Sequence, residues 1–505
     1  MSSPRTSDRI RSLGSDTAVY GVSTILGRFL TFLLTPLYTH VLVPGDLGIV
    51  ANVYAYIALL NVVYGYGMES AYMKYVSTLE VGTKRQVFSI PFVAVACTAT
   101  LFSLAIILNA SRLGGAVGVP VEWTHLLVYG AAILFLDALA LIPFAALRME
   151  RMARTFAAIK LGGIGINVVL NVVLLFSAHL GIEGIFISNL VSSALTLAML
   201  TPTIVDRFAP GWHSGLFRAL LRFGLPTVPA GFAAMLVQVV NRPILESLKG
   251  SAAVGIFQAN YRLGIFMMLL VSMFDFAWRP FFFAHANDSD ARQLFARILT
   301  YVVAGLTTIF LLLSFFLPDL VRAPIWGGYP LIAKPYWVGL EIIPVILLAY
   351  LFLGVYNNLV AGIYIQKRTE VLPAVTFLGA GLNIVANLLL IPPFGLMGAA
   401  CATLISYAVE TTVMALFVRR IYPVPYEGKR LAKIGLSAGA VYVASLVLPS
   451  DVWGLVGRAV LAAVFFLLLH FLRFFRPGEL YALASLVRRR GLAAPTEPPP
   501  PSPTE

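Results

Sequence analysis

The sequence predicts an all-α integral membrane protein with about 14 transmembrane helices, and composition is the first reason. Of its 505 residues, 59% are hydrophobic and 12% are charged, whereas soluble domains carry about 25% charged residues. The second reason is that apolar segments of about 20 residues, long enough to cross a bilayer as a helix, recur from Ala18 to Leu472. Such unbroken apolar runs exclude a membrane β-barrel, whose strands alternate apolar and polar residues.

The apolar segments divide into two groups of six and a final pair. The first group covers 18–43, 47–76, 87–108, 121–147, 156–178 and 182–205. The second group covers 223–248, 252–283, 294–317, 336–365, 371–391 and 395–418, and the final pair covers 432–448 and 452–472. The domains expected are a cytoplasmic N-terminus (1–17), an N-lobe (18–205), a linker (206–222), a C-lobe (223–418), two added helices (432–472) and a disordered, proline-rich cytoplasmic tail (473–505).

The linker has the pattern of a basic amphipathic helix. Its leucine and phenylalanine residues alternate with Arg218 and Arg222. A helix of this kind lies in the interface plane of a membrane, with its apolar face in the lipid. We therefore expect it on the cytoplasmic leaflet, joining the lobes without locking them.

The two groups of six are an internal repeat. Pro36, Gly48, Ile49 and Tyr54 match Pro243, Gly255, Ile256 and Tyr261 at a constant offset of 207, and Asn167 and Asn171 match Asn383 and Asn387 at an offset of 216. Because each unit has an even number of helices, both copies enter the membrane from the same side. Parallel repeats of this kind predict two facing lobes and an alternating-access transporter with its substrate site in the cleft between them. Duplicated bundles also occur in channels and scaffolds, which stay open as alternatives.

The formal charge of +13 follows the membrane topology. With the N-terminus in the cytoplasm, 28 of the 36 Lys and Arg fall on the cytoplasmic side, 4 on the outer side and 4 within helices. This is the positive-inside rule. The basic balance therefore predicts cytoplasmic termini and does not indicate a nucleic-acid partner.

Three arginines within apolar segments are the candidate substrate-binding cations: Arg28, Arg242 with its neighbour Asn241, and Arg262. A charge within a bilayer costs about 2.5–3.5 kcal/mol on insertion scales, so each is a functional hypothesis. A guanidinium binds phosphate through charge-assisted, bidentate hydrogen bonds. The alternatives are an ion pair between Arg28 and a neighbouring helix, and a pair between Arg242 and Glu246, four residues later.

Four carboxylates also fall within or at the ends of apolar segments: Glu69, Asp137, Asp275 and Glu410. Glu69 and Asp275 each precede a base, so helix-end salt bridges are one interpretation. The other is a gate between the lobes or a site that couples transport to a proton or cation.

Neither a metal nor a cofactor is expected. Cys97 and Cys401 fall inside predicted helices, which argues against a disulfide framework or a cysteine-based metal site. The sequence contains no phosphate-binding nucleotide loop. We therefore expect a transporter that is not an enzyme.

Several short stretches resemble one family of membrane proteins. They are DTAVYG at 16–21, LGRF at 26–29, TPLYT at 35–39, YGMESA at 66–71 and the pattern Asn383, Asn387, Gly395, Gly398. The chain is similar here to polysaccharide biosynthesis and export proteins, which include Wzx-type oligosaccharide flippases of the multidrug, oligosaccharidyl-lipid and polysaccharide exporter superfamily. The resemblance implies a central cavity lined by helices 1, 2, 7 and 8.

The same resemblance implies a cargo and a location. The cargo would be a polyprenyl-diphosphate-linked oligosaccharide for lipopolysaccharide, O-antigen or exopolysaccharide synthesis, with its pyrophosphate drawn to Arg28 and its tail in the membrane lipid. The location would be the bacterial inner membrane, where the protein would act as a monomer beside a polysaccharide polymerase and glycosyltransferases.

Three rival functions stay open. A drug or organic-cation antiporter of the same superfold would need a carboxylate cluster in the N-lobe cavity, whereas the first segment offers Arg28 and no acid. A lipid II flippase differs only in its substrate. A scaffold that transports nothing would tolerate substitution of Arg28.

Overall fold

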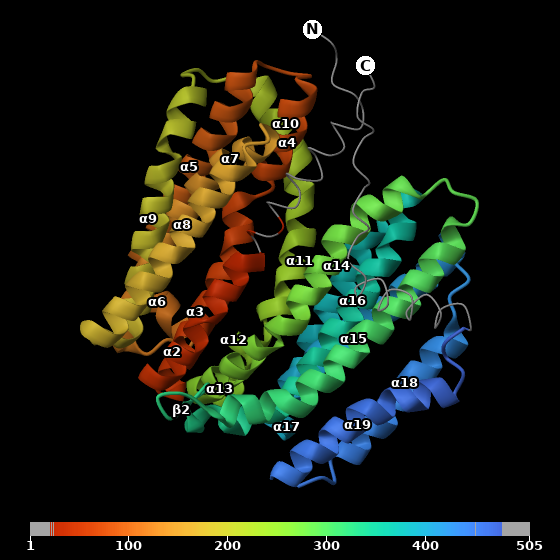
Figure 1. The fold of residues 1–505 in the computed structure, drawn as a ribbon. Helices are drawn as coiled ribbons and strands as arrows, with labels where there is room; N and C mark the ends of the chain where they lie inside the picture. The colour runs from red at the N-terminus through yellow and green to blue at the C-terminus, as the bar shows by residue number, and fades with distance from the viewer. Residues whose placement is uncertain (1–20, 22, 24, 450, 477–505) are drawn as a thin grey trace, which may run out of the picture.

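The computed structural model describes residues 21, 23, 25–449 and 451–476. The expected N-terminal segment 1–17 and residues 477–505 of the expected tail lie outside this part of the chain. Figure 1 shows two helical bundles that meet at the end where α2, α13 and β2 lie. The bundles separate toward the opposite end, where α4 and α10 lie.

The first bundle begins with a helical stretch over 25–32. It continues with α2 (Leu34–Val41), α3 (Pro44–Gly65), α4 (Met68–Thr78), α5 (Lys84–Leu108), α6 (Ala110–Ala116), η1 (Val121–Trp123), α7 (His125–Met149), α8 (Ala153–Val172), the π-helical turn η2 (Val173–Ser177) and α9 (Gly181–Arg207). Two elements then lead to the second bundle, α10 (Ser214–Gly224) and η3 (Leu225–Thr227).

The second bundle contains α11 (Val228–Val239), α12 (Asn241–Lys249), α13 (Ser251–Tyr261), η4 (Arg262–Gly264), α14 (Ile265–Ala284), α15 (Ala291–Arg322), η5 (Lys334–Ile342), α16 (Ile343–Ile365) and α17 (Val371–Ile421). A short antiparallel hairpin of β1 (Pro324–Trp326) and β2 (Tyr329–Pro330) follows α15. The last helices, α18 (Gly428–Ser445) and α19 (Val452–Phe471), pack on α15 at the outer edge of this bundle (Figure 1).

The predicted all-α membrane fold is confirmed, but the predicted number of membrane-spanning helices is not reached in the described chain. Eleven helical stretches of the described chain are long and apolar enough to cross a membrane. One of them, α17, covers both predicted segments 371–391 and 395–418, which Gly395 separates with the non-helical angles φ 54° and ψ −124°. A positive φ is readily adopted by glycine, so the chain turns there without a loop.

The repeat seen in the sequence recurs in the hydrogen bonds. The Asn171 side-chain amide donates to the Asn167 carbonyl oxygen at 2.8 Å, and Asn387 donates to Asn383 in the same way at 2.8 Å. Asn171 also accepts from the Tyr38 hydroxyl at 2.9 Å. In the C-lobe, the Asn383 side-chain amide donates to the Ser406 hydroxyl at 2.9 Å and joins the two halves of α17. These buried amides therefore find partners both within and between helices.

Two repeat-related glycines bring the lobes into contact. Gly48 of α3 lies against the backbone of Ser251, and Gly255 of α13 lies against the backbone of Pro44. A Cβ atom at either position would overlap those backbone atoms. At the same end of the molecule, the Tyr336 hydroxyl donates to the Leu42 carbonyl oxygen at 2.8 Å. This end is therefore closed by direct backbone contact.

The linker between the lobes forms the amphipathic helix α10. Its Leu216 and Leu220 are buried, and the helix packs on α4 and α5. Arg218 and Arg222 are exposed on its other face. The expectation that this apolar face lies in lipid is therefore wrong for its buried leucines, which contact protein, while the basic face is exposed.

Candidate functional site

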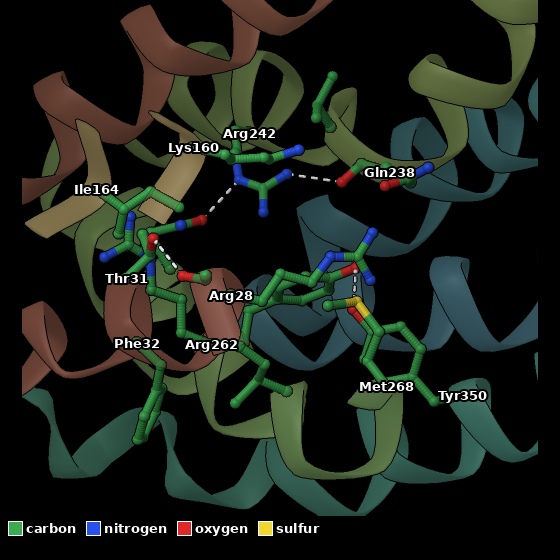
Figure 2. A pocket seen from close by; sticks show the side chains of 15 residues that line it. Arg28, Thr31, Phe32, Lys160, Ile164, Gln238, Arg242, Arg262, Met268 and Tyr350 are labelled. Carbon is green, nitrogen blue, oxygen red and sulfur yellow. Dashed lines mark hydrogen bonds between the residues drawn. The ribbon is translucent and has the colours of Figure 1, made fainter. Parts of the chain in front are cut away.

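A cavity of about 520 Å³ lies between the two bundles. The first helical stretch and α8 contribute Arg28 and Lys160 from one side, and α12 and η4 contribute Arg242 and Arg262 from the other. Figure 2 shows these four side chains around the same space. Gln238, Gln258, Tyr261 and Tyr350 supply further polar groups to the wall.

Arg28 connects the two lobes beside this cavity. Its guanidinium donates to the Ser272 hydroxyl of α14 at 3.2 Å. The residues that the structure describes include no carboxylate in an ion pair with it. A single neutral acceptor leaves most of the five guanidinium N–H donors available to a ligand.

Arg242 is held by neutral partners. It is 7% exposed, and it donates to the Gln258 side chain and to the Gln238 carbonyl oxygen, each at 2.6 Å. The considered pair with Glu246 does not form, since Glu246 accepts from the Ser251 hydroxyl at 2.7 Å. Long helical side chains point toward the N-terminus of their helix, which carries Arg242 back to residue 238 and away from residue 246.

Asn241 lies beside this arginine but outside the cavity wall. It is fully buried, and its side-chain oxygen accepts from Arg242 at 3.4 Å. The structure therefore brings Arg28, Arg242 and Arg262 together, and it leaves Asn241 behind them.

Arg262 stacks on an aromatic ring. Its guanidinium carbon is 5.7 Å from the ring centroid of Tyr38, whose hydroxyl is already bonded to Asn171. Cation–π stacking of this kind orients a guanidinium without neutralising its charge. Arg262 faces both the central cavity and a cavity of about 470 Å³ within the N-lobe.

Lys160 is a site residue that the sequence analysis missed. Counting loop charges assigned it to the cytoplasmic side, four residues into the segment expected at 156–178. In the structure α8 begins at Ala153, so Lys160 lies about 10 Å along the helix at 1.5 Å per residue. Arg154, the charge at the true start of the helix, was the sequence signal that could have identified Lys160 as a residue within the helix.

The electrostatics of the central cavity follow from these positions. Two arginines come from the C-lobe and an arginine and a lysine from the N-lobe, and no Asp or Glu is among the described residues that line it. Positive charges in a low-dielectric setting interact strongly with an anion. The arrangement can bind a phosphate-like group and would repel an organic cation.

Two of the predicted acidic residues lie in an adjoining cavity of about 390 Å³ in the C-lobe. Asp275 forms an ion pair with Arg279 at 3.0 Å, one helical turn later. Glu410 faces the same space from α17. Arg28, Gln238, Met268 and Tyr350 line both this cavity and the central one, so the two spaces are adjacent.

The other two acids lie in a cavity of about 440 Å³ in the N-lobe. Glu69 pairs with Arg148 of α7 and not with the nearby Lys74. Asp137 accepts from the Ser193 hydroxyl at 2.8 Å. Lys160 lines this cavity as well as the central one.

No metal-binding cluster is found in the part of the chain that the structure describes. Groups of three or more His, Cys, Asp or Glu with suitable geometry are absent among these residues. Cys97 and Cys401 are not joined by a disulfide.

The fold is that of known multi-pass membrane transporters. The chain is similar to the lipid II flippase MurJ in an inward closed conformation, with 17% identity, 90% of this chain and 99% of MurJ covered, and a TM-score of 0.69. It is also similar to an inward-facing multidrug resistance MATE family transporter of the MOP superfamily, with 16% identity, 79% and 95% covered, and a TM-score of 0.63. A variant of the Vibrio cholerae MATE transporter VcmN gives 16% identity, 81% and 97% covered, and a TM-score of 0.58.

Sequence comparison gives the family. The polysaccharide biosynthesis protein family model matches residues 38–322, more than half of the chain, so the chain belongs to this family. No curated protein sequence matches the chain significantly. The resemblance drawn from short motifs is thereby confirmed, and the chain is a multi-pass membrane protein of this family with a transporter fold.

Proposed function

We propose that the chain is a flippase that moves a polyprenyl-diphosphate-linked oligosaccharide across the bacterial inner membrane for lipopolysaccharide, O-antigen or exopolysaccharide synthesis. The observation that carries the proposal is the central cavity, where Arg28, Lys160, Arg242 and Arg262 meet without a lining carboxylate. A diphosphate offers several anionic oxygens to these donors. Guanidinium and ammonium groups bind such oxygens through short, charge-assisted hydrogen bonds.

The size of the cavity supports capture of the head group rather than of the whole cargo. About 520 Å³ suits a small polar ligand or part of a larger one. A polyprenyl tail can stay in the bilayer, where its burial costs nothing. The membrane lipid therefore takes part in the transport cycle, and no catalytic step on the cargo is needed.

The arrangement of the lobes supports alternating access. The helices α3 and α13 close one end, and the bundles separate toward the end that carries α10 (Figure 1). With 1–17 and 473–505 in the cytoplasm, as the positive-inside rule predicts, this state faces inward. The moving units would be the N-lobe (18–205) and the C-lobe (223–418), joined by the linker 206–222, with helices 432–472 attached to the C-lobe.

The rival functions differ in charge and substrate. An organic-cation antiporter would place a carboxylate against its cargo, whereas the central cavity offers four cations. A lipid II flippase would present the same diphosphate with a different sugar. As a monomer, the protein would receive cargo made by glycosyltransferases and deliver it to a polymerase.

Deleting the gene in its host tests this proposal. Loss of surface polysaccharide, restored by the wild-type gene but not by Arg28→Ala, is the expected result when membrane levels of both proteins are equal. Arg28→Lys should restore part of it, because the charge remains while the bidentate geometry is lost. Normal polysaccharide after deletion, with raised sensitivity to cationic drugs, would refute the flippase and favour the antiporter.

A further inference from the structure

Glu410 is a buried acid with no ionic partner in the described chain. It lies on α17 beyond the Gly395 break, is 7% exposed and faces the C-lobe cavity. No described side chain donates a hydrogen bond to it or forms an ion pair with it. The other predicted acids differ, since Glu69 and Asp275 have ion pairs and Asp137 accepts a hydrogen bond.

The helix that carries Glu410 folds back against its own first half. The carboxylate contacts Gly379, where a Cβ atom would overlap it. The helix backbone of 371–391 bonds to itself, and the Thr376 hydroxyl on this half donates to the Leu372 carbonyl oxygen at 3.0 Å instead of to Glu410. The carboxylate therefore has space on the cavity side and no compensating donor on the protein side.

The remaining groups around this cavity come from five elements. Asp275 of α14 is paired with Arg279, and Arg28 of the first helical stretch is bonded to Ser272. The other ionisable groups are tyrosines, namely Tyr350 and Tyr356 on α16 and Tyr407 on α17. The helix α11 contributes Gln238 and apolar side chains. Among the described residues, Arg28 is the only cation that lines this cavity, and it also lines the central cavity.

A carboxylate in this setting is costly in its charged form. Burying an ion without a partner costs several kcal/mol, and such groups in proteins commonly become neutral instead. Proton uptake achieves this directly. A sodium ion would need several oxygen ligands, and the neighbouring acid Asp275 is already engaged by Arg279.

We propose that Glu410 takes up and releases a proton, and that the C-lobe cavity is the site where proton binding is coupled to cargo binding. A water molecule in the cavity delivers the proton, an O–H bond forms on one carboxylate oxygen, and release to water regenerates the anion. The proton site rests on the geometry of the C-lobe alone, whereas its coupling to cargo rests on the proposed function.

Arg28 provides the physical link between the two events. When Glu410 is ionised, the anionic groups of the C-lobe cavity compete with cargo phosphate for the Arg28 guanidinium. When Glu410 is neutral, this competition weakens and Arg28 is free for the cargo. Proton binding and cargo binding should therefore favour each other, and the effect must be reciprocal.

The first experiment labels the wild-type protein and needs no variant. Dicyclohexylcarbodiimide reacts with protonated carboxyl groups in apolar surroundings, and peptide mass spectrometry locates the adduct. We expect labelling of Glu410 in the full-length protein in detergent, falling as pH rises and unchanged by added sodium chloride. Absence of the adduct at every pH, or protection by sodium at constant pH, would overturn the proton site.

The second experiment tests coupling with a polyprenyl diphosphate as the probe. In the wild type, the Kd should rise with pH, by about 5- to 150-fold as is usual for two coupled sites. Glu410→Gln, which resembles the protonated acid, should bind at all pH values with the low-pH affinity. Glu410→Asp should keep the pH dependence, and so should the matched control Asp275→Asn.

The outcomes separate the two proposals. Equal pH dependence in the wild type and Glu410→Gln would overturn coupling through Glu410. Failure of the wild type to bind the diphosphate would refute the proposed cargo, while the labelling experiment would still decide whether Glu410 binds a proton.

Discussion

The Arg262 guanidinium stacks on Tyr38 and keeps its hydrogen-bond donors for the cavity. Replacing Arg262 with Ala should weaken binding of a polyprenyl diphosphate by about 10- to 100-fold, because hydrogen bonds to charged groups contribute roughly 1.5–3 kcal/mol. Thermophoresis of the purified protein would measure the Kd. The Kd of Arg262→Lys should lie between the values for the wild type and for Arg262→Ala.

The chain offers a matched control for this substitution. Arg292 stacks on Tyr422 at 5.1 Å, outside the cavity. Arg292→Ala removes the same kind of cation–π contact and should leave the Kd unchanged. Equal losses from both substitutions would show that stacking, and not contact with the diphosphate, explains the effect.

A second prediction at the scale of single residues concerns Lys160. Its ammonium group lies 5.4 Å from the Phe156 ring centroid and faces the central cavity. Lys160→Met keeps the length of the side chain and removes its charge, so polysaccharide export by a complemented deletion strain should fall, whereas Lys160→Arg should retain it. Lys74→Met is the control, since Lys74 stacks on Phe223 outside that cavity. Undiminished export by Lys160→Met would show that Lys160 is not part of the binding site.

The sequence could predict that arginines within apolar runs line a cavity, because a charge in such a run is costly unless it faces a polar space. Arg28, Arg242 and Arg262 all line the central cavity. Partners could be predicted only in part: spacing gave Arg279 as the base after Asp275, and that ion pair forms. Spacing also suggested Lys74 as the partner of Glu69 and Glu246 as the partner of Arg242. Contacts between helices and the direction of the side chains give these two residues different partners. The structure thus supplied Lys160 and the isolation of Glu410.

At the scale of elements, the crossing of α3 and α13 depends on glycine. Gly48→Ala should prevent the closest approach of the lobes, because the added Cβ would meet the Ser251 backbone. Spin labels placed on the two lobes at this end should show a longer distance by double electron–electron resonance. Gly45→Ala lies on the same helix in open space and should leave the distance unchanged. A short distance in both variants would contradict this role of Gly48.

A charge cluster ties three helices at the end of the N-lobe. Glu150, just after α7, accepts from Arg207 of α9 at 3.1 Å and lies 3.5 Å from Lys84 of α5. The hydrogen bonds from Arg207, with the charge of Lys84, lower the pKa of Glu150. The ionised Glu150 carboxylate therefore contributes its full stabilisation above the ordinary pKa of a glutamate. That stabilisation is lost as the pH falls through the lowered pKa of Glu150.

Glu150→Gln tests that contribution. At neutral pH the variant should have a lower Tm, by the equivalent of about 1 kcal/mol for a pair that solvent still reaches in part. The difference from the wild type should vanish in acid, as measured by differential scanning fluorimetry. Glu370→Gln, which removes an exposed pair with Arg368, should not change the Tm. A Tm difference that persists in acid would mean that packing, not charge, explains the effect.

Element positions followed well from the sequence, and their boundaries did not. The apolar segments described by the structure are helical, because length and hydropathy control membrane insertion. The break at Gly395 without a loop, and the division near Tyr66, where φ is 25°, depend on backbone angles that hydropathy does not report. The contact of α10 with α4 and α5 was likewise hidden, since an amphipathic face can meet either lipid or protein.

At the scale of the whole molecule, the repeat explains both the closed end and the central cavity. Gly48 and Gly255 occupy corresponding positions in the two halves and contact each other's helices. The cations beyond this crossing come from both lobes. A movement that separates α3 from α13 would therefore also change the spacing of Arg28 and Lys160 from Arg242 and Arg262, so cargo binding and lobe movement should be linked.

The central claim is that these four cations bind a diphosphate head group. Native mass spectrometry of the wild-type protein with a polyprenyl diphosphate, the corresponding polyprenol and a lipophilic organic cation tests it most directly. We predict that the diphosphate binds at the lowest concentration, and that a variant with all four cations replaced by glutamine loses this preference. Preferred binding of the organic cation, or undiminished diphosphate binding by that variant, would contradict the account.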